Sequence, residues 1–234
     1  MTVAAVVVVH EEGPELARCV ASLEPQVDEL VVIRNLVDNP RPLGFAANAN
    51  QGLARTSAPF VVIANPDTEA APDAVALLRE FAESRPRCGI AGPQLFYPDG
   101  THQPSRRHFP TVGGTLVRRT PLRKVLNPDY HYYDDRPEQP DGADWMLGAF
   151  LLLRRRMLEE LRGFDEGYRL YGEDIDLAYR AEKAGWERWY VPAARVTHVH
   201  ARVSDRRFFT RHTLWHWRGI ARFVRKHPER LRAL

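Results

Sequence analysis

The chain has 234 residues, of which 44% are hydrophobic and 27% charged, a composition that excludes disordered and fibrous proteins. This length accommodates one generous domain, or one domain with an appendage. The net charge of +3 conceals an asymmetry, because residues 201–234 contain ten Lys or Arg against two acidic residues, whereas residues 1–200 contain 23 against 28. Such a basic tail favours an anionic partner, either a membrane surface or a nucleic acid.

Cysteine content and hydropathy restrict the compartment. Cys19 and Cys88 are too few for a disulfide framework and lack the spacing of zinc ligands, so a reducing cytoplasm is expected. The apolar run of residues 3–9 is far shorter than the roughly 18 residues of a membrane-spanning helix, and we interpret it as a buried strand.

The first hundred residues alternate between β-branched apolar runs and amphipathic segments. This pattern predicts strands over residues 3–9, 29–33, 60–64 and 88–92, separated by helices over residues 14–23, 44–54 and 72–81. Such alternation implies a parallel sheet with right-handed crossovers, whose ligands bind beyond the carboxyl ends of the strands. Polar residues directly follow three of these strands, and we expect them to meet at that edge: His10-Glu11, Arg34-Asn35 and Asn65-Pro66-Asp67.

The second half of the chain is less regular. Residues 97–144 are rich in Pro, Asp, Arg and Tyr without periodicity, which is typical of a functional or mobile loop. The pattern then predicts a strand over residues 145–155, a helix over residues 156–161 that ends at Gly163, and a helix from residue 173 that ends at Gly185. Two strands, over residues 186–191 and 194–200, and a basic amphipathic helix complete the prediction. The apolar stripe of that last helix would be Leu214, Trp217, Ala221 and Val224.

The segment NPDT, residues 65–68, has two interpretations. Asp67 follows a buried strand, and Pro66 fixes the approach, so its carboxylate could be a ligand of a hard divalent cation such as Mg²⁺ or Mn²⁺. Alternatively, the segment is an ordinary turn in which Thr68 or Asp67 caps the next helix. These four residues alone favour the turn.

The segment YGEDID, residues 171–176, also has two interpretations. Three acidic residues at the start of a helix are stabilised by the helix dipole, by a few tenths to about 1 kcal/mol. The functional alternative makes Asp174 a general base that takes a proton from an attacking hydroxyl. Nearby aromatic residues would suit a stacking wall for a sugar, although aromatic residues are more often part of the core.

His198 and His200 alternate along a predicted strand and therefore share one face of it. A neutral imidazole on that face could complete a metal shell begun by Asp67. An isolated histidine is more often a satisfied core or surface residue, so this motif depends on the other segments.

Five longer segments occur together in a fixed order. They are GFAANANQGL (44–53), VVIANPDTEAAPDAV (61–75), GIAGPQLFYPDGTHQPSRRHFPT (89–111), DWMLGAFLLLRRRMLEELRGFDEGYRLYGEDIDLAYRAEKAGW (144–186) and VPAARVTHVHARVS (191–204). Taken together, they resemble the family 2 glycosyltransferases, and in particular the rhamnosyltransferase-like branch. The similarity spans residues 3–204.

The resemblance implies an α/β protein with the GT-A fold, in which helices flank a mostly parallel central sheet. Residues 1–204 would form the glycosyltransferase domain, and residues 205–234 would add a basic amphipathic helix rather than a separate domain. The implied reaction is inverting transfer of a sugar from a UDP-, dTDP- or GDP-linked donor to a hydroxyl of a polysaccharide, cell-wall or lipid-linked glycan.

The resemblance also implies roles for individual residues. Asp67 would match the metal-binding acid of the family, and His198 would join the shell of a Mn²⁺ or Mg²⁺ ion. Asp174 would be the general base. The acceptor would lie beside Glu173, Trp145 and Tyr171. The donor nucleotide would contact His10, Glu11, Arg34, Asp38, Gly44, Asn48, Asn50 and Asn65.

One segment departs from the family pattern. Relatives usually place an aspartate that holds the nucleotide base directly after the second strand, and a longer loop follows. Here ELVVIRNLVDNPRPLGFAAN is abbreviated, so either Asp38 substitutes through a shifted loop or the base is bound differently.

The basic tail has a simple interpretation as a solvated helix that packs its apolar stripe on the body of the protein. It also suits a peripheral contact with anionic lipid headgroups, on the inner face of the plasma membrane. We expect no nucleic-acid partner, because no recognition motif accompanies the charge.

Two alternative functions remain open at this point. A non-catalytic nucleotide-sugar-binding protein would explain the shortened loop, although the acidic cluster at residues 173–176 is complete. A nucleotidyltransferase could use a similar sheet, although the first strand is not followed by a glycine-rich phosphate loop with Lys or Arg.

Overall fold

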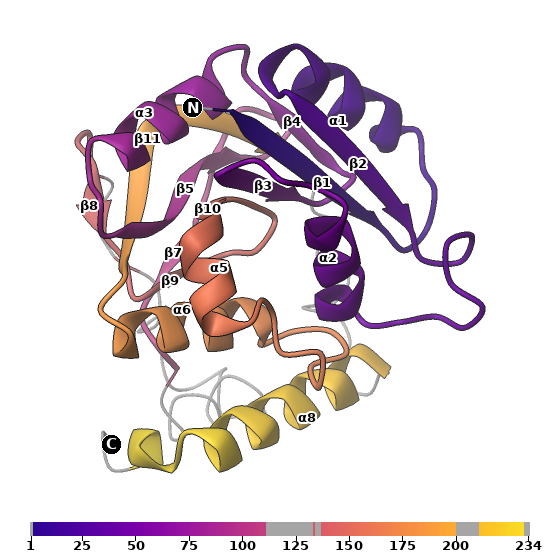
Figure 1. Cartoon of the computed structure of the whole chain (residues 1–234), viewed down its shortest axis with the longest axis vertical. Helices are drawn as coiled ribbons and strands as arrows, with labels where there is room; N and C mark the ends of the chain where they lie inside the picture. Colours follow the sequence, from indigo (N-terminus) through magenta and orange to yellow (C-terminus); the bar gives the residue numbers. More distant parts are fainter. Residues whose placement is uncertain (1, 111–132, 134–136, 200–210, 232–234) are drawn as a thin grey trace.

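The computed structural model describes residues 2–110, 133, 137–199 and 211–231. Its central sheet has the spatial order β2 (Glu29–Arg34), β1 (Val3–Val9), β3 (Phe60–Ala64), β10 (Phe150–Arg154), β5 (Cys88–Phe96), β11 (Glu187–His198) and β4 (Thr68–Ala70) (Figure 1). Two short strands extend it, β6 (His102–Gln103) beside β5 and β8 (Asp141–Gly142) beside β11. A separate two-stranded sheet pairs β7 (Arg106–Arg107) with β9 (Trp145–Met146).

The sheet is mixed but mostly parallel, which confirms the predicted fold class. β1 is parallel to β2 and β3, and β5 is parallel to β11. β10 is antiparallel to both β3 and β5, and β4 is antiparallel to β11. Five of the strands on this path therefore point the same way, and the ends of β1, β2 and β3 lie at one edge, where the site was predicted.

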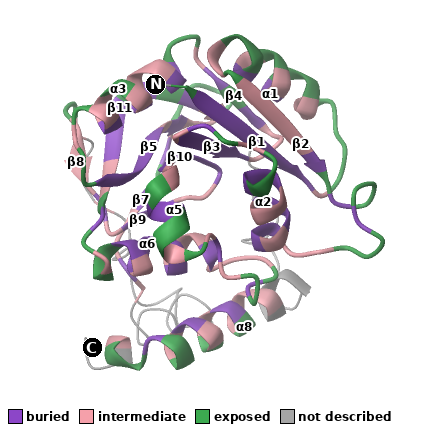
Figure 2. Ribbon diagram, in the orientation of Figure 1, coloured by how far each residue is buried: buried purple, intermediate pink, exposed green. Residues whose placement is uncertain are grey.

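Helices cover both faces of the sheet. α1 (Glu15–Leu23), followed by the short 3₁₀ helix η1 (Glu24–Gln26), and α3 (Ala74–Glu83) lie on one face (Figure 1). α2 (Phe45–Ala54), α5 (Arg155–Leu161) and α6 (Glu173–Lys183) lie on the other. In β1, Val7 packs towards α1 and α3 whereas Val6 and Val8 pack towards the second group. Burial on both faces explains why β1 is continuously apolar (Figure 2).

The C-terminal helix α8 (Arg211–Lys226) lies beyond α6, and the 3₁₀ helix η4 (Pro228–Leu231) follows it (Figure 1). Its buried residues include Gly219 and Phe223, and His227 is buried just beyond its end. The predicted apolar stripe is therefore wrong where it can be checked, because Ala221 is exposed and Trp217 is only half-buried. The stripe was chosen on hydropathy, whereas α8 docks through a glycine and aromatic side chains.

The predicted strand over residues 145–155 is interrupted, because the segment 147–149 leaves both sheets between β9 and β10. Its backbone is bound elsewhere: the Leu147 N–H donates to the Ser105 carbonyl oxygen at 3.0 Å, and the Gly148 N–H donates to Asp174 Oδ2 at 3.1 Å. The apolar sequence conceals this break because both partners are distant in the chain.

The two strands predicted over residues 186–191 and 194–200 are one long strand, β11, with a register shift between Val191 and Arg195. Pro192 lies within this irregularity, as expected for a residue that has no N–H to donate to a neighbouring strand. His200 lies outside the described residues.

The interpretation of NPDT as a helix cap is also wrong. Thr68 begins the short strand β4, and α3 starts only at Ala74, with Asp73 as its N-cap residue. No helix follows Asp67 directly, so its carboxylate is not needed to cap one.

Candidate functional site

The NPDT turn presents Asp67 at the end of β3. Thr68 Oγ1 donates to the Asn65 carbonyl oxygen at 2.7 Å, and the Thr68 N–H donates to the same oxygen at 3.3 Å. The Asp67 carbonyl oxygen accepts a hydrogen bond from the Val199 N–H at 2.9 Å. The backbone of the turn is therefore fixed on both sides, whereas the Asp67 side chain stays partly accessible.

His198, at the end of β11, brings its imidazole to Asp67. His198 Nε2 lies 3.4 Å from Asp67 Oδ1, and the His198 side chain is almost fully buried. His198 Nδ1 lies 2.8 Å from Gln103 Oε1. An amide oxygen only accepts hydrogen bonds, so Nδ1 carries a hydrogen, and Nε2 is the ring nitrogen that faces Asp67.

This pair fits a divalent cation. Two lone-pair atoms this close are stabilised by a cation between them or by a proton on the imidazole. Two ligands about 2.1 Å from one ion and at right angles would be roughly 3 Å apart, close to the observed separation. A carboxylate suits Mg²⁺ and Mn²⁺ alike, and an imidazole is a common ligand of transition-metal ions. Among the described residues, no group of three or more His, Cys, Asp or Glu could hold a metal.

Asp174 lies in the first turn of α6, and its carboxylate is held by two backbone groups. Oδ2 accepts from the Gly148 N–H at 3.1 Å, and Oδ1 accepts from the Ile175 N–H at 2.8 Å. Burial raises the pKa of Asp174 above its usual value, although these hydrogen bonds and the nearby Arg107 guanidinium oppose the shift. A fixed carboxylate with a raised pKa has the properties of a general base.

Glu173 precedes it and has a different environment. The Glu173 side chain is buried, and its Oε2 has no hydrogen-bond partner within the described part of the chain. Burial and the neighbouring Asp174 charge raise the pKa of Glu173 to about 8. At neutral pH, Glu173 therefore holds a proton more readily than an ordinary glutamate.

The segment 147–149 contacts both the NPDT turn and the acidic start of α6. The Asn65 N–H donates to the Ala149 carbonyl oxygen at 2.8 Å, while the adjacent Gly148 N–H binds Asp174. Asn65 and Asp174 are far apart in the sequence but contact neighbouring residues of one segment. The NPDT turn and the start of α6 therefore lie at the same edge of the sheet.

His10, at the end of β1, forms a polar cluster with the loop after β2. Asn35 Nδ2 lies 2.9 Å from His10 Nδ1 and donates to the Leu43 carbonyl oxygen at 3.1 Å, and the Leu43 N–H donates to Asn35 Oδ1 at 2.8 Å. Burial lowers the pKa of His10, although Glu11 opposes the shift. His10 Nδ1 accepts from the amide, so its Nε2 carries the hydrogen.

The abbreviated loop after β2 is held by its own side chains. The Asp38 carboxylate accepts from the Arg34 N–H at 2.5 Å, and Arg34 Nε donates to Glu12 at 2.6 Å. Asp38 and Arg34 are exposed, as is Glu11. Asn48 is fully buried, where it accepts from Asn39 Nδ2 at 2.9 Å. The predicted contacts of a donor nucleotide with Glu11, Arg34, Asp38 and Asn48 stay predictions.

Two predicted donor residues in and before α2 contact the loop ahead of α6. Gly44 lies against Arg169, where a Cβ atom would come within 2.7 Å of the carbonyl oxygen, so the close approach requires glycine. Asn50 forms a pair of hydrogen bonds with the Phe164 backbone, both 2.9 Å long. Both residues therefore position the loop 163–171 that leads to Asp174.

The acceptor-side residues have unequal accessibility. Trp145 is buried, and its indole N–H donates to the His108 carbonyl oxygen at 2.9 Å. Tyr171 is half-buried, and its ring stacks on the His216 ring of α8 at a centroid distance of 3.6 Å. Of these two, only Tyr171 retains appreciable surface.

Three residues of this site were missed from the sequence. Gln103 orients His198, Gly148 binds Asp174, and Arg107 places positive charge near Asp174. Gln103 and Arg107 lie in a segment used only for the resemblance, and Gly148 lies in an apolar run. No local spacing in the sequence indicates that Gln103 lies beside His198, or that Gly148 and Arg107 lie beside Asp174.

Comparison with known proteins identifies the chain as a glycosyltransferase with the GT-A fold. A family model described as glycosyltransferase-like family 2 matches residues 1–215, and the chain belongs to this family. The structure is similar to GalNAc-T7 solved with UDP, GalNAc and Mn²⁺, with a TM-score of 0.69 and 19% identity over 96% of this chain and 47% of that one. It is also similar to the mannosyltransferase PcManGT from Pyrobaculum calidifontis solved with GDP-Man and Mn²⁺, with a TM-score of 0.60 and 15% identity over 96% and 64%.

Two curated relatives are rhamnosyltransferases. The N-acetylglucosaminyl-diphospho-decaprenol L-rhamnosyltransferase of Mycobacterium tuberculosis is 34% identical over 86% of this chain and 77% of the relative. The rhamnosyltransferase WbbL of Escherichia coli is 30% identical over 70% of this chain and 61% of the relative. These similarities confirm the family and its rhamnosyltransferase-like character, and they identify the chain as an enzyme.

Proposed function

We propose that the protein transfers a sugar, with inversion, from a nucleotide-diphosphate donor to a hydroxyl acceptor, with Asp174 as the general base. The observation that carries this proposal is the segment 147–149, which binds the NPDT turn through Ala149 and the Asp174 carboxylate through Gly148. A base and a metal-binding turn that are hydrogen-bonded to adjacent residues, Gly148 and Ala149, suit a single displacement.

The Asp174 carboxylate takes the proton of the acceptor hydroxyl while the hydroxyl oxygen forms a bond to the anomeric carbon of the donor sugar. The bond from that carbon to the diphosphate oxygen breaks, and its electron pair leaves with the nucleotide diphosphate. The hydrogen bonds from Gly148 and Ile175 fix the carboxylate, and the raised pKa of Asp174 favours acceptance of the proton.

Asp67 and His198 would hold a Mn²⁺ or Mg²⁺ ion, and Gln103 keeps the imidazole in the tautomer that can bind it. Such an ion, when bound, neutralises charge that builds up on a leaving diphosphate. The donor's own phosphates and water would complete a shell to which the protein gives few ligands.

The names of the curated relatives support a rhamnosyl donor and a lipid-linked glycan acceptor. The half-buried Tyr171 would lie on the acceptor side, next to Glu173. His10 and Asn35 close the end of β1, where the nucleotide would bind.

Two substitutions test the proposal. Asp174→Asn should lower turnover by roughly 10²- to 10⁴-fold, the usual contribution of a general base, while the affinity for nucleotide diphosphate is unchanged. Asp67→Ala should abolish the Mn²⁺-dependent increase in the affinity for nucleotide diphosphate. Turnover can be measured as release of UDP, dTDP or GDP, and affinity by calorimetry with and without Mn²⁺. The exposed residue Asp73 offers a control, Asp73→Asn. Unchanged turnover in Asp174→Asn would exclude Asp174 as the base.

We further propose that α8 contacts the anionic surface of a membrane. Arg218, Ala221 and Arg225 are exposed on one side of α8, flanked by the half-buried Trp217 and Val224. Apolar residues bordered by arginine suit lipid headgroups of negative charge. In the part of the chain that the structure describes, no helix is long and apolar enough to span a bilayer.

A further inference from the structure

The turn that precedes α6 has an unusual backbone. Tyr171 has a φ of 70° and Gly172 a φ of 102°, so two consecutive residues are left-handed immediately before Glu173 and Asp174. For a residue with a side chain, this conformation is strained. The direction in which α6 starts depends on this turn, and the turn therefore requires support from outside.

α8 supplies that support by direct contact. The His216 ring lies flat on the Tyr171 ring, with 3.6 Å between centroids and 8° between planes. One helical turn further along α8, Gly219 lies so close to the turn that a Cβ atom would be 2.4 Å from the Tyr171 carbonyl oxygen. The turn is thus held by an aromatic stack and by close packing on its carbonyl group.

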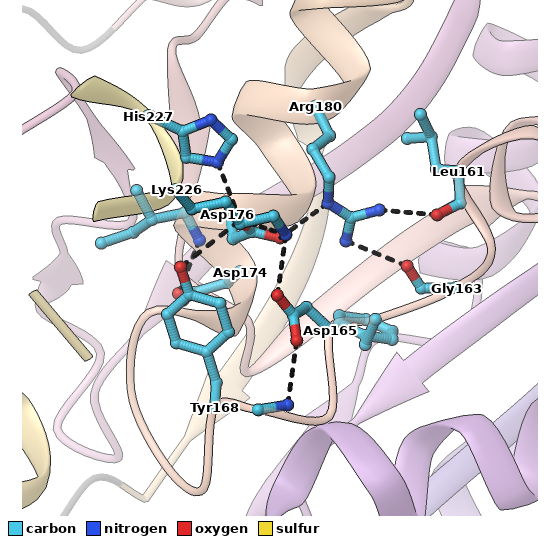
Figure 3. A network of polar contacts seen from close by, with 12 residues as sticks. Leu161, Gly163, Asp165, Tyr168, Asp174, Asp176, Arg180, Lys226 and His227 are labelled. Carbon is cyan, nitrogen blue, oxygen red and sulfur yellow. Dashed lines mark hydrogen bonds and ion pairs between the residues drawn. The ribbon is translucent and has the colours of Figure 1, made fainter. Parts of the chain in front are cut away.

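Ion pairs fix the other end of α8. Arg222 Nη2 lies 2.7 Å from Asp165 Oδ1. Lys226 lies 2.8 Å from Asp165 and 2.9 Å from Asp176 (Figure 3). His227 Nε2 lies 2.9 Å from Asp176 as well. These contacts prevent α8 from sliding along the start of α6.

Asp176 connects this network to the proposed base. Its side chain is fully buried and accepts a 2.6 Å hydrogen bond from Arg180, which also donates to the carbonyl oxygens of Leu161 and Gly163 (Figure 3). Asp176 lies in the same helical turn as Asp174, only two residues away. A displacement of α8 would therefore move the turn that carries Asp174.

We infer that α8 positions Asp174 for proton transfer, with His216 and Gly219 as positioning residues. The inference rests on the proposed role of Asp174. Its physical basis is the 3.1 Å hydrogen bond between Gly148 and Asp174, which a small shift of the first turn of α6 would break. A misplacement of about 1 Å can lower the rate of a catalysed step roughly 100-fold.

Gly219→Ala separates positioning from folding. Alanine has a higher helix propensity than glycine, so α8 itself should not weaken. The added methyl group must nevertheless push the Tyr171 carbonyl away. We expect kcat to fall at least tenfold, while the KM for the sugar donor and the melting temperature change little. Gly142→Ala is the matched control, because a Cβ atom at Gly142 would have no neighbour within 4 Å.

The stacked ring gives an independent test. His216→Phe keeps a flat ring on Tyr171 and should retain kcat, whereas His216→Ala removes the stack and should lower kcat with the donor KM unchanged. If Gly219→Ala fails to fold, the comparison of His216→Phe with His216→Ala still tests whether α8 positions Asp174. Equal kcat in Gly219→Ala, His216→Ala and Gly142→Ala, alongside an inactive Asp174→Asn, would overturn the positioning role alone. An active Asp174→Asn would instead overturn the proposed function.

Discussion

Two neighbouring carboxyl groups, those of Glu173 and Asp174, differ because different backbone groups surround them. Asp174 accepts two backbone hydrogen bonds, whereas one oxygen of Glu173 has no partner in the described part of the protein. Burial raises the pKa of both, and the Asp174 charge adds to the shift of Glu173. The pair is therefore adapted to share one negative charge.

Glu173→Gln should change how stability depends on pH. The pKa of Glu173 rises from 4.5 to about 8 on folding, so between these values the folded state binds more protons than the unfolded state. The free energy of unfolding of the wild type should then fall as pH rises from 4.5 to 8. In the variant this fall should be smaller but still present, because Asp174 contributes in the same direction. Urea denaturation at pH 5 and pH 8 measures both slopes, and identical slopes would contradict the burial of a protonated Glu173.

Gly148→Ala should disturb the base without affecting the metal-binding pair. A methyl group at Gly148 would lie 3.2 Å from the Asp174 Cβ atom, closer than most such contacts. We expect turnover to fall about tenfold, equivalent to about 1.4 kcal/mol of transition-state stabilisation. Nucleotide affinity in the presence of Mn²⁺, measured by calorimetry, should stay within twofold of the wild type. A larger loss of affinity than of turnover would show that Gly148 serves the donor instead.

Sequence patterns located the main acidic and histidine residues but not their partners. Asp67 and His198 were predicted to share a site, and the structure places them together. Gln103, Gly148 and Arg107 were missed because their contacts are formed by backbone and side chains that are distant in sequence. The predicted donor residues Asn48 and Asn50 also form internal hydrogen bonds, which their positions on a predicted helix could not reveal.

At the scale of elements, alternation of strands and helices was sufficient to predict the mostly parallel sheet. It was insufficient for β10, whose apolar residues are equally compatible with parallel and antiparallel neighbours. The break between β9 and β10 and the bulge in β11 both depend on backbone partners outside the local segment. These irregularities shape the site, as is common for bulges near functional residues.

The docking of α8 should respond to acid. Hydrogen bonds from Arg222 and Lys226 lower the pKa of Asp165 although burial opposes the shift. Its contribution to stability is therefore complete above the unfolded value of 3.8 and is lost as pH falls through the lower folded pKa.

Asp165→Asn should accordingly lower the free energy of unfolding by about 2 kcal/mol at pH 7, the usual size for hydrogen bonds to a charged group. The difference from the wild type should shrink below pH 3.8. Guanidinium denaturation at several pH values measures it, with Asp73→Asn as an exposed control. A difference that stays constant down to pH 2 would contradict the ion pairs.

At the scale of the whole molecule, four basic residues in the described part of α8 fall into two groups. Arg222 and Lys226 pair with the carboxylates of Asp165 and Asp176, which neutralise their charge. Arg218 and Arg225 are exposed and remain for an external partner. Composition predicted the excess of positive charge. It could not show which basic residues are paired and which are exposed, because this depends on the side of α8 that packs on α6.

Reversal of the exposed charges should weaken membrane binding. We expect the double variant Arg218→Glu with Arg225→Glu to bind phosphatidylglycerol vesicles at least about thirtyfold more weakly, because each lost basic residue contributes about 1 kcal/mol and the new glutamates are repelled. The control Arg55→Glu with Arg156→Glu changes the net charge equally at exposed positions outside α8. Vesicle flotation compares the two variants, and equal loss in both would attribute the binding to net charge rather than to α8.

The place of β10 in the sheet also has a consequence for the order of folding. β10 pairs with β3 on one side and with β5 on the other, although both of those strands precede it by more than fifty residues. During synthesis, β3 and β5 therefore keep unpaired edges until the ribosome has released residue 154. Edges of this kind are sites of aggregation, so the interval between β5 and β10 is the period in which a nascent chain of this protein most needs chaperone protection.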